Sequence, residues 1–233
     1  MKKSIKHIRT IALAIFLFTN QGLFAQHDLG IKLGLGFSKT APHFVDTEYS
    51  RFRVNYKPSG LLGVFYNYQL NDRFYFGTDM AFSQIEGRID AEYHSFFSID
   101  GEIYVTNSSN RSAAYHLSYL TIPIYVGTKG KGFNLVLGWQ TGVLIRGTYR
   151  DKSNYLIDDE WAETSSFSDD IGFDQLDFGS YLEMGYNLTE KWNVHLNYYQ
   201  GLNDLLPSEL IVVDEVKPWR NSQFTIGCSY QFF

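Results

Sequence analysis

Residues 29–38 read LGIKLGLGFS, with an apolar side chain at every second position from Leu29 to Phe37. Successive side chains of a β-strand point to opposite faces, so this stretch places Leu, Ile and Phe on one face. The other face carries Gly30, Lys32, Gly34, Gly36 and Ser38. A charged face that is otherwise small and glycine-rich suits a narrow polar lumen. The stretch therefore predicts a strand of a transmembrane β-barrel, with its apolar face turned toward lipid.

The same alternation returns in seven further segments, and together they predict the fold. They lie at 60–70, 74–82, 117–126, 133–145, 176–188, 192–198 and 224–232. Most are close to the length that a tilted strand needs to cross a bilayer. The connections alternate between short ones at 71–73, 128–132 and 189–191 and long ones at 39–59, 87–116, 147–175 and 203–221. Short periplasmic turns and long external loops predict an all-β, eight-stranded antiparallel up-and-down transmembrane β-barrel.

The first 25 residues have the pattern of an export signal. Lys2, Lys3, Lys6 and Arg9 precede an apolar run at 11–18, and Ala25 offers a cleavage site before Gln26. The run is too short for a spanning helix, so we predict a signal peptide at 1–25 and one barrel domain at 26–233. Export followed by strand insertion predicts location in the cell outer membrane.

Charge and cysteine content exclude several classes of function. Loss of the signal removes four basic residues and no acidic one, which leaves 16 Lys and Arg against 25 Asp and Glu, a net charge near −9. Such a chain has no general attraction for nucleic acid. Cys228 is the single cysteine, so neither an intrachain disulfide nor a thiolate metal cluster can form. We expect no cofactor, no metal site and no nucleic-acid partner.

The ionisable residues on the glycine-rich face are the candidate site. They are Lys32, Asp79, Arg146, Asp177, Glu183 and His195. A one-residue shift of any strand would move such charges into lipid, at a cost of about 2–4 kcal/mol for a basic side chain at the midplane. Because unpaired buried charges are costly, we predict that these groups pair with one another as a structural plug. A pathway for protons, ions or a ligand is the less favoured alternative.

The chain resembles the PorT-like outer-membrane β-barrel proteins of Bacteroidetes-type bacteria. The likeness rests on LGIKLG at 29–34, YLTIPI at 119–124, DFG at 177–179, YQGLND at 199–204 and the terminal YQFF at 230–233. Thr121 departs from the family, which often has an acid before Ile-Pro. The resemblance covers the mature chain and implies an eight-stranded barrel in the outer membrane. It implies no single activity, although the family's namesake acts in protein secretion.

Two segments raise alternatives to a purely structural barrel. His116 and Ser118 share one strand face, a spacing similar to that of some outer-membrane lipid A deacylases. A serine nucleophile also needs a base held by a third group, and no partner is evident in the sequence. The sequence between Asp151 and Asp177 is acidic and could hold a hard cation, but its spacing matches no dedicated calcium loop. Polar rim residues and a solvated acidic loop are the favoured interpretations.

Aromatic residues in the long connections are candidates for contact with a partner. They are Tyr93, Phe96 and Phe97 in the second connection and Trp161, Phe167 and Phe173 in the third. The leading hypothesis is a non-enzymatic barrel that serves as a structural or docking component of the cell envelope, with a link to protein secretion. Its expected partners are outer-membrane lipid, lipopolysaccharide and other envelope proteins. The alternatives are a lipid-modifying enzyme and a soluble lipocalin-like ligand-binding barrel, which would have an apolar lumen and a polar exterior.

Overall fold

The computed structural model describes residues 27–41, 50–99, 102–130, 132–157, 160–168, 173–205 and 218–232. The predicted signal peptide lies outside these residues. All regular structure in this part of the chain is β-strand: β1 (His27–Ala41), β2 (Ser50–Gln69), β3 (Phe74–Ile99), β4 (Glu102–Lys129), β5 (Phe133–Ile157), β6 (Glu160–Ser168), β7 (Leu176–Asn187), β8 (Trp192–Gly201) and β9 (Arg220–Gln231). No helix in the described ranges is long and apolar enough to span a membrane.

Eight of the nine described strands form a closed antiparallel ring. The order is β4-β3-β2-β1-β9-β8-β7-β5, and an additional β4–β5 pairing closes it. The first and last strands of the chain pair directly, from Gly30 opposite Gln231 to Ala41 opposite Arg220. The predicted eight-stranded barrel is therefore confirmed. The remaining strand, β6, pairs with the outer part of β5 and is not part of the ring.

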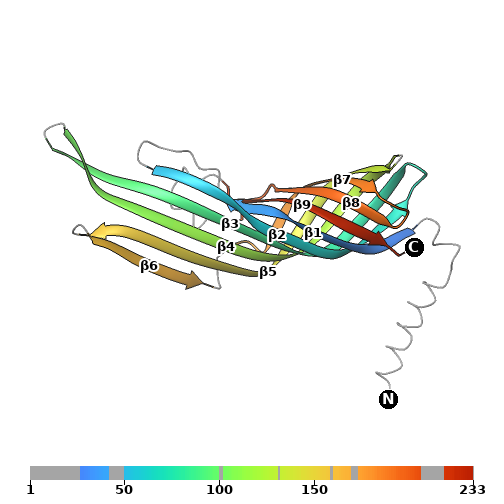
Figure 1. Ribbon diagram of the computed structural model, residues 1–233, viewed down its shortest axis with the longest axis horizontal. Coiled ribbons are helices and arrows are strands. Elements are labelled where there is room, and N and C mark those ends of the chain that lie inside the picture. Colours follow the sequence, from blue (N-terminus) through green and yellow to red (C-terminus); the bar gives the residue numbers. More distant parts are fainter. Residues whose placement is uncertain are drawn as a thin grey trace, which may run out of the picture.

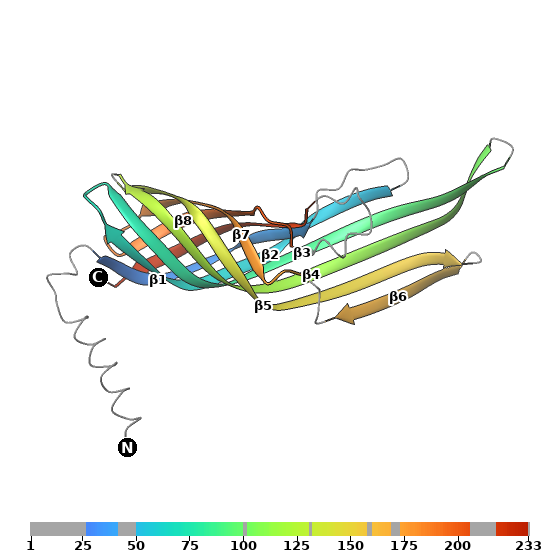
Figure 2. The same ribbon diagram turned by 180° about the vertical axis from the view of Figure 1, so that it is seen from behind.

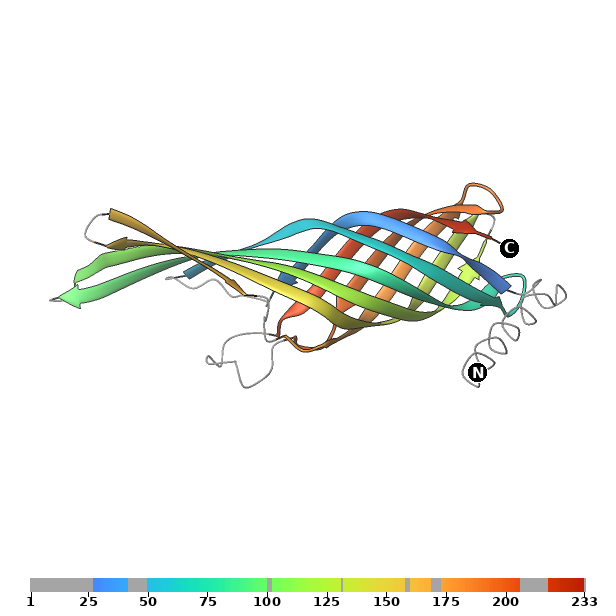
Figure 3. The same ribbon diagram turned by 90° about the horizontal axis from the view of Figure 1, so that it is seen from below.

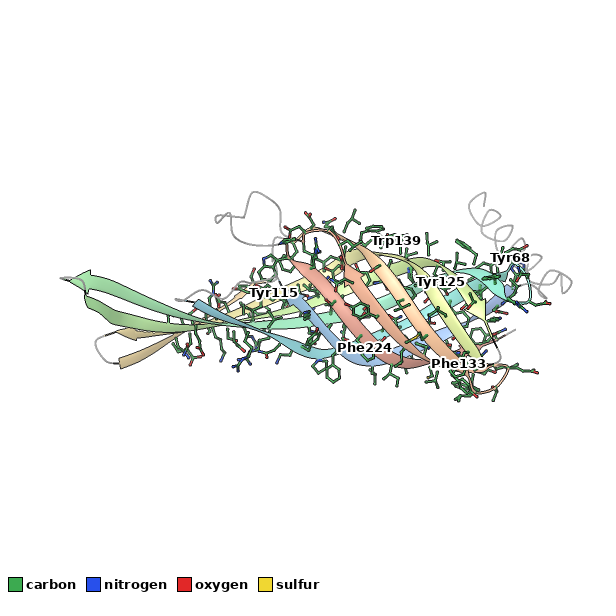
Figure 4. The ribbon with its side chains drawn as sticks, turned by 90° about the horizontal axis from the view of Figure 1, so that it is seen from above. Tyr68, Tyr115, Tyr125, Phe133, Trp139 and Phe224 are labelled. Atoms are coloured by element: carbon green, nitrogen blue, oxygen red, sulfur yellow. The ribbon has the colours of Figure 1, made fainter. Side chains whose placement is uncertain are left out.

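A belt of exposed apolar side chains surrounds the ring. Leu33, Leu62, Met80, Ile124 and Ile226 are between 49% and 59% exposed, each at a position that the sequence pattern turned outward. Figure 4 shows Phe133, Trp139 and Phe224 on the outer side of the barrel wall. Since a large apolar surface of this kind requires lipid, the belt marks the membrane-spanning part of the molecule. This arrangement is the reverse of the soluble lipocalin-like alternative.

Three strands continue far beyond the belt, which the sequence interpretation did not anticipate. β3, β4 and β5 have 26, 28 and 25 residues, against 12 and 10 for β7 and β8. Figures 1, 2 and 3 show their outer parts projecting from one end of the barrel, with β2 and β6 beside them. We call the outer parts of β2 to β5, together with β6, the projecting sheet.

The prediction that 87–116 and 147–175 are long connections was therefore wrong for most of their length, and the prediction for 39–59 was wrong from Ser50, where β2 begins. Residues 87–99 pair with 102–115, and 149–157 pair with 160–168. The reason is a change in polarity along the strand. On β3, the inward residues Ile85 and Ile89 are apolar and buried, so the strand has the pattern of a half-buried soluble sheet rather than that of a membrane strand.

Candidate functional site

The interior of the barrel is built from the inward positions of all eight ring strands. Alternate residues of each strand point inward, and glycines leave room for the larger side chains. At Gly227, for example, a Cβ atom would meet the ring of His195 on the neighbouring strand. The interior therefore depends on small residues at defined positions opposite large ones.

Lys32 lies at the centre of a buried ion-pair cluster. Its Nζ atom donates to Asp79 Oδ2 at 2.6 Å and to Glu183 Oε2 at 3.0 Å. All three side chains are less than a tenth exposed. They come from β1, β3 and β7, and β1 pairs with neither of the other two strands. The cluster therefore ties together strands from different sides of the ring.

Tyrosine hydroxyls donate further hydrogen bonds to the carboxylates of Asp79 and Glu183. Tyr125 donates to Asp79 Oδ1 at 2.6 Å, and Tyr181 donates to Glu183 Oε2 at 2.6 Å. The Tyr125 and Tyr181 rings stack with centroids 5.8 Å apart, and Tyr75 meets Tyr125 edge to face. Figure 4 labels Tyr125 on β4 within the barrel. Each buried carboxylate thus has two donors, as charged groups in a low-dielectric interior require.

Asp177 lies in the interior apart from this cluster, whereas His195 lies beside it, close enough to Glu183 and Lys32 for an electrostatic interaction but without a hydrogen bond to either. His195 is 1% exposed, and neither ring nitrogen has a hydrogen-bond partner. Asp177 accepts a hydrogen bond from Asn221 Nδ2 at 2.7 Å, and Asn221 also donates to the hydroxyl of Tyr119 at 3.1 Å. The predicted network is therefore divided into a lysine-centred cluster and a second, mainly uncharged one nearer the outer mouth.

Arg146 is not in the lumen, contrary to the prediction. Its side chain is exposed on the outer wall, opposite Ser118 of β4. The β4–β5 register shifts between Ser118 and Tyr119, so that Ile145 and Arg146 both face outward. A bulge of this kind inserts one extra residue and reverses the facing of everything beyond it. The three consecutive apolar residues Val143, Leu144 and Ile145 were the sequence signal for this bulge.

The outer mouth of the ring is closed by apolar and aromatic side chains. Ile85, Leu117 and Tyr119 are fully buried, and Leu144 and Phe173 pack against them. Beyond them, the Tyr115 ring stacks on Phe173 and meets Trp219 edge to face. Figure 4 labels Tyr115 where the barrel gives way to the projecting sheet. Phe173 is therefore part of this plug and not an exposed partner contact, whereas Phe167 is 59% exposed.

The mouth formed by the short turns, which we expect on the periplasmic side and call the periplasmic mouth, holds a small polar pocket of about 110 Å³. Asp28 lies in its wall and accepts hydrogen bonds from Lys129 at 2.8 Å, Gln69 at 2.5 Å and Gln231 at 2.8 Å. This volume accommodates only a few water-sized molecules. Together with the buried side chains described above, this fits an interior occupied largely by side chains, as expected for eight strands.

His116 and Ser118 lie on the outer wall just above the apolar belt. His116 Nδ1 is 2.7 Å from Glu86 Oε1, whose strand β3 runs beside β4. The sequence analysis did not identify this acid, because the neighbour of β4 depends on strand register. Ser118 is 8% exposed, and in the described part of the chain no hydrogen bond joins it to His116. The arrangement is an acid–histidine pair with a serine two residues along the same strand.

Several functional candidates fall on residues whose side chains the structure does not describe. They are Tyr93, Phe96, Phe97 and Trp161 among the aromatic residues, and Asp158, Asp159, Asp169 and Asp170 in the acidic segment. Within the described ranges, no three metal-ligating side chains gather in one place. The interior residues that the sequence did not single out include Tyr75, Tyr125, Tyr181 and Asn221. The signal that could have identified them is the alternation itself, because they occupy the strand positions between lipid-facing residues.

Comparison with known proteins agrees with the fold. A family profile described as "Outer membrane protein beta-barrel domain" matches residues 24–206. No curated protein matches the sequence. Among solved structures, the attachment invasion locus protein Ail of Yersinia pestis, in complex with the heparin analogue sucrose octasulfate, is 10% identical, with a TM-score of 0.39 over 89% of this chain and 99% of Ail. Neisserial surface protein A is 9% identical, with a TM-score of 0.39 over 88% and 97%. Escherichia coli outer membrane protein W is 11% identical, with a TM-score of 0.30 over 87% and 97%.

Proposed function

Since the chain belongs to the outer membrane protein beta-barrel domain family and lies in the cell outer membrane, we propose that it is a non-enzymatic barrel that displays a docking surface outside the cell. In this proposal the ring is the anchor and the projecting sheet is the surface presented to other envelope proteins. The filled interior supports an anchoring role, because side chains from all eight ring strands compete for the space that a solute would need.

The projecting sheet is the observation that carries the proposal. A tilted strand crosses the bilayer with about 9–11 residues. β3 and β4 have 26 and 28 residues, so more than half of each lies beyond that requirement. The antiparallel pairing continues through this outer part, from β2 across to β6. An ordered sheet of this size offers a large, defined surface, and Phe167 on β6 stands exposed on it.

Site-specific photo-cross-linking in living cells tests the docking role. A photoreactive amino acid at Phe167 on the projecting sheet should capture one envelope protein reproducibly. The matched position is Leu62, which is similarly exposed at 59% but lies in the lipid-facing belt. We expect no protein product from Leu62. Equal capture from both positions, or none from Phe167, would contradict the docking role and leave the barrel as a structural membrane component.

We further propose that the docking partner belongs to the protein secretion apparatus. The PorT-like sequence motifs suggest this more specific role. Deletion of the gene should then lower the amount of secreted protein in the medium while total cell protein stays constant. Restoration should require a chain that retains the projecting sheet, so a variant lacking residues 92–110 should fail to complement. An unchanged secretome after deletion would refute the secretion link and leave the docking role to be judged by cross-linking.

A lipid-modifying enzyme is the second candidate, and the Glu86–His116 contact favours it. The acid and the histidine lie on the outer wall at 2.7 Å, two residues along the strand from Ser118. Ester hydrolysis would need Ser118 to contact His116 as its base. The test is release of radiolabelled acyl chains from outer-membrane saccharolipid by the purified protein. We expect no release. Release that Ser118→Ala and His116→Ala both abolish would establish the enzyme instead.

A further inference from the structure

A groove with cationic walls lies on the outer face of the projecting sheet. Its floor is the small side chains Ser112 and Ala114 of β4. Arg88 of β3 and Arg150 of β5 are both register partners of Ala114, so they flank it on either side. Lys152 flanks Ser112 in the same way. Because neighbouring strands are about 4.8 Å apart, the backbones of the two arginines are about 10 Å apart, with an open floor between them.

The cations of this groove outnumber its anions. Arg88, Arg150 and Lys152 line it, against Asp90 and Glu92, whereas Arg111 at its border alternates with Ser112 onto the other face and pairs with Asp151 at 2.6 Å. Arg88 Nε donates to Asp90 at 2.8 Å, and Lys152 is 3.4 Å from Glu163. Among the described residues, no carboxylate is within 4.0 Å of the Arg150 guanidinium. Of the groove's cations, Arg150 is therefore the one without an ion-pair partner among the described residues.

Asp90 stays ionised in this setting. Partial burial raises the pKa of Asp90, but hydrogen bonds from Arg88, Ser112 and Asn55 outweigh burial and hold the pKa below its ordinary value. The carboxylate therefore offsets the charge of Arg88 without cancelling the excess of positive charge. In a chain with a formal net charge of −5, a groove of the opposite sign is a local specialisation.

The groove continues the lipid-facing surface of the barrel. On β3, the outward positions run from Met80 and Phe82 through Gln84 and Glu86 to Arg88. On β4, they run from Ile122 up to Ala114 in the same way. Arg146 is exposed between the belt and the groove. A lipid whose acyl chains lie along this side of the belt would therefore extend its head group toward Arg146, Arg150 and Arg88.

We propose that this groove binds the phosphorylated saccharide head group of an anionic saccharolipid in the outer leaflet. Guanidinium groups bind phosphate with two parallel hydrogen bonds, and Arg150 and Arg88 supply two such groups on opposite walls. The small residues of the floor leave room for a sugar ring between them. The continuity of the groove with the belt selects a membrane lipid as the occupant rather than a soluble anion. This inference does not rest on the proposed protein-docking role.

The test is titration of the purified full-length protein, in zwitterionic detergent, with a deacylated bis-phosphorylated saccharolipid head group. We expect saturable binding that the double variant Arg88→Gln/Arg150→Gln weakens at least tenfold. Asp90→Asn, which removes an anion from the groove, should tighten binding about threefold. Arg220→Gln is the matched control, because Arg220 is an exposed arginine on β9, outside this groove. All these side chains are on the surface, so the variants should keep the wild-type thermal unfolding.

Three results would overturn the proposal. Wild-type affinity in Arg88→Gln/Arg150→Gln would show that the groove is not the binding site. An equal loss in Arg220→Gln would reduce the effect to general charge. Binding of inorganic phosphate, or of the dephosphorylated saccharide, as tight as that of the intact head group would remove the lipid as the specific ligand. Head-group binding would remain measurable even if cross-linking from Phe167 captured nothing, so the two proposals can fail separately.

Discussion

At the scale of single residues, Lys32 has the most consequential position in the molecule. Its ammonium group lies between two buried carboxylates, at 2.6 Å from Asp79 and 3.0 Å from Glu183. Removing it would leave both acids buried without a cation. Breaking a buried ion pair by removing one partner costs about 3–5 kcal/mol, because the remaining charge is neither solvated nor paired.

Lys32→Met should therefore lower the free energy of unfolding by about 3–5 kcal/mol, measured by urea denaturation of the protein refolded into lipid vesicles. Lys129→Met is the matched control, since Lys129 pairs with Asp28 at the periplasmic mouth and its side chain is 34% exposed. The control should cost about 1 kcal/mol or less. The triple variant Lys32→Met/Asp79→Asn/Glu183→Gln should recover part of the loss. Wild-type stability in Lys32→Met would show that the cluster does not brace the ring.

The sequence predicted that Lys32, Asp79, Glu183 and Arg146 all point inward; the first three do, but Arg146 is exposed on the outer wall. The first three follow an unbroken alternation, so the phase of the strand determines their side. Arg146 comes after an inserted residue, and the alternation alone does not locate it. The ion-pair partner of each charged residue is harder to predict than its direction. Lys32 pairs with Glu183 and not with Asp177 because of strand tilt and register across the ring, which no local sequence pattern encodes.

At the scale of the element, β3 carries two opposite patterns in one strand. Up to Phe82 its outward residues are apolar apart from Thr78, and Asp79 and Ser83 lie inward. From Gln84 onward the outward residues are polar, and Ile85 lies inward and buried. The change falls within two residues and marks where the hydrocarbon region ends. Only the first pattern is typical of a membrane strand, so it predicts the spanning half of β3, while the second pattern was interpreted as a loop.

A pair of substitutions on the outward face of β3 should locate this boundary. Met80→Arg places a charge in the belt, where Met80 is 54% exposed. It should cost about 2–4 kcal/mol of folding free energy in bilayers. Gln84→Arg lies four residues along the same face and should cost about 0–1 kcal/mol, as expected near the interface. The measurement is equilibrium unfolding from vesicles. Equal costs at the two positions would contradict the placement of the belt.

At the scale of the whole molecule, a filled anchor is joined to a long ordered sheet. Tyr119, Tyr199, Leu117 and His195 each have less than 2% of their surface exposed in the interior. Tyr115 and Trp219 close the outer end. The fold class and the membrane location could be predicted from the sequence, because the alternation of apolar and polar residues fixes which face of each strand meets lipid. The projecting sheet could not, because its pattern resembles that of a soluble protein.

The filled interior predicts that the protein conducts no steady ionic current. Purified protein inserted into planar lipid bilayers should leave the conductance at that of the bare membrane, whereas a wide porin under the same conditions serves as the positive control. The physical reason is that eight strands enclose a space that their own side chains occupy. Discrete, long-lived channel openings from the wild-type protein would show that the interior rearranges into a pathway.

The orientation of the barrel, with the projecting sheet outside the cell and the β7–β8 turn in the periplasm, is tested most directly by labelling single cysteines. In a Cys228→Ser background, Phe167→Cys on the projecting sheet and Glu190→Cys in the turn are treated with a polymer-linked maleimide too large to cross the outer membrane. We predict that Phe167→Cys reacts in intact cells and that Glu190→Cys reacts only after the outer membrane is permeabilised. Labelling of Glu190→Cys in intact cells, with Phe167→Cys protected until permeabilisation, would contradict the account.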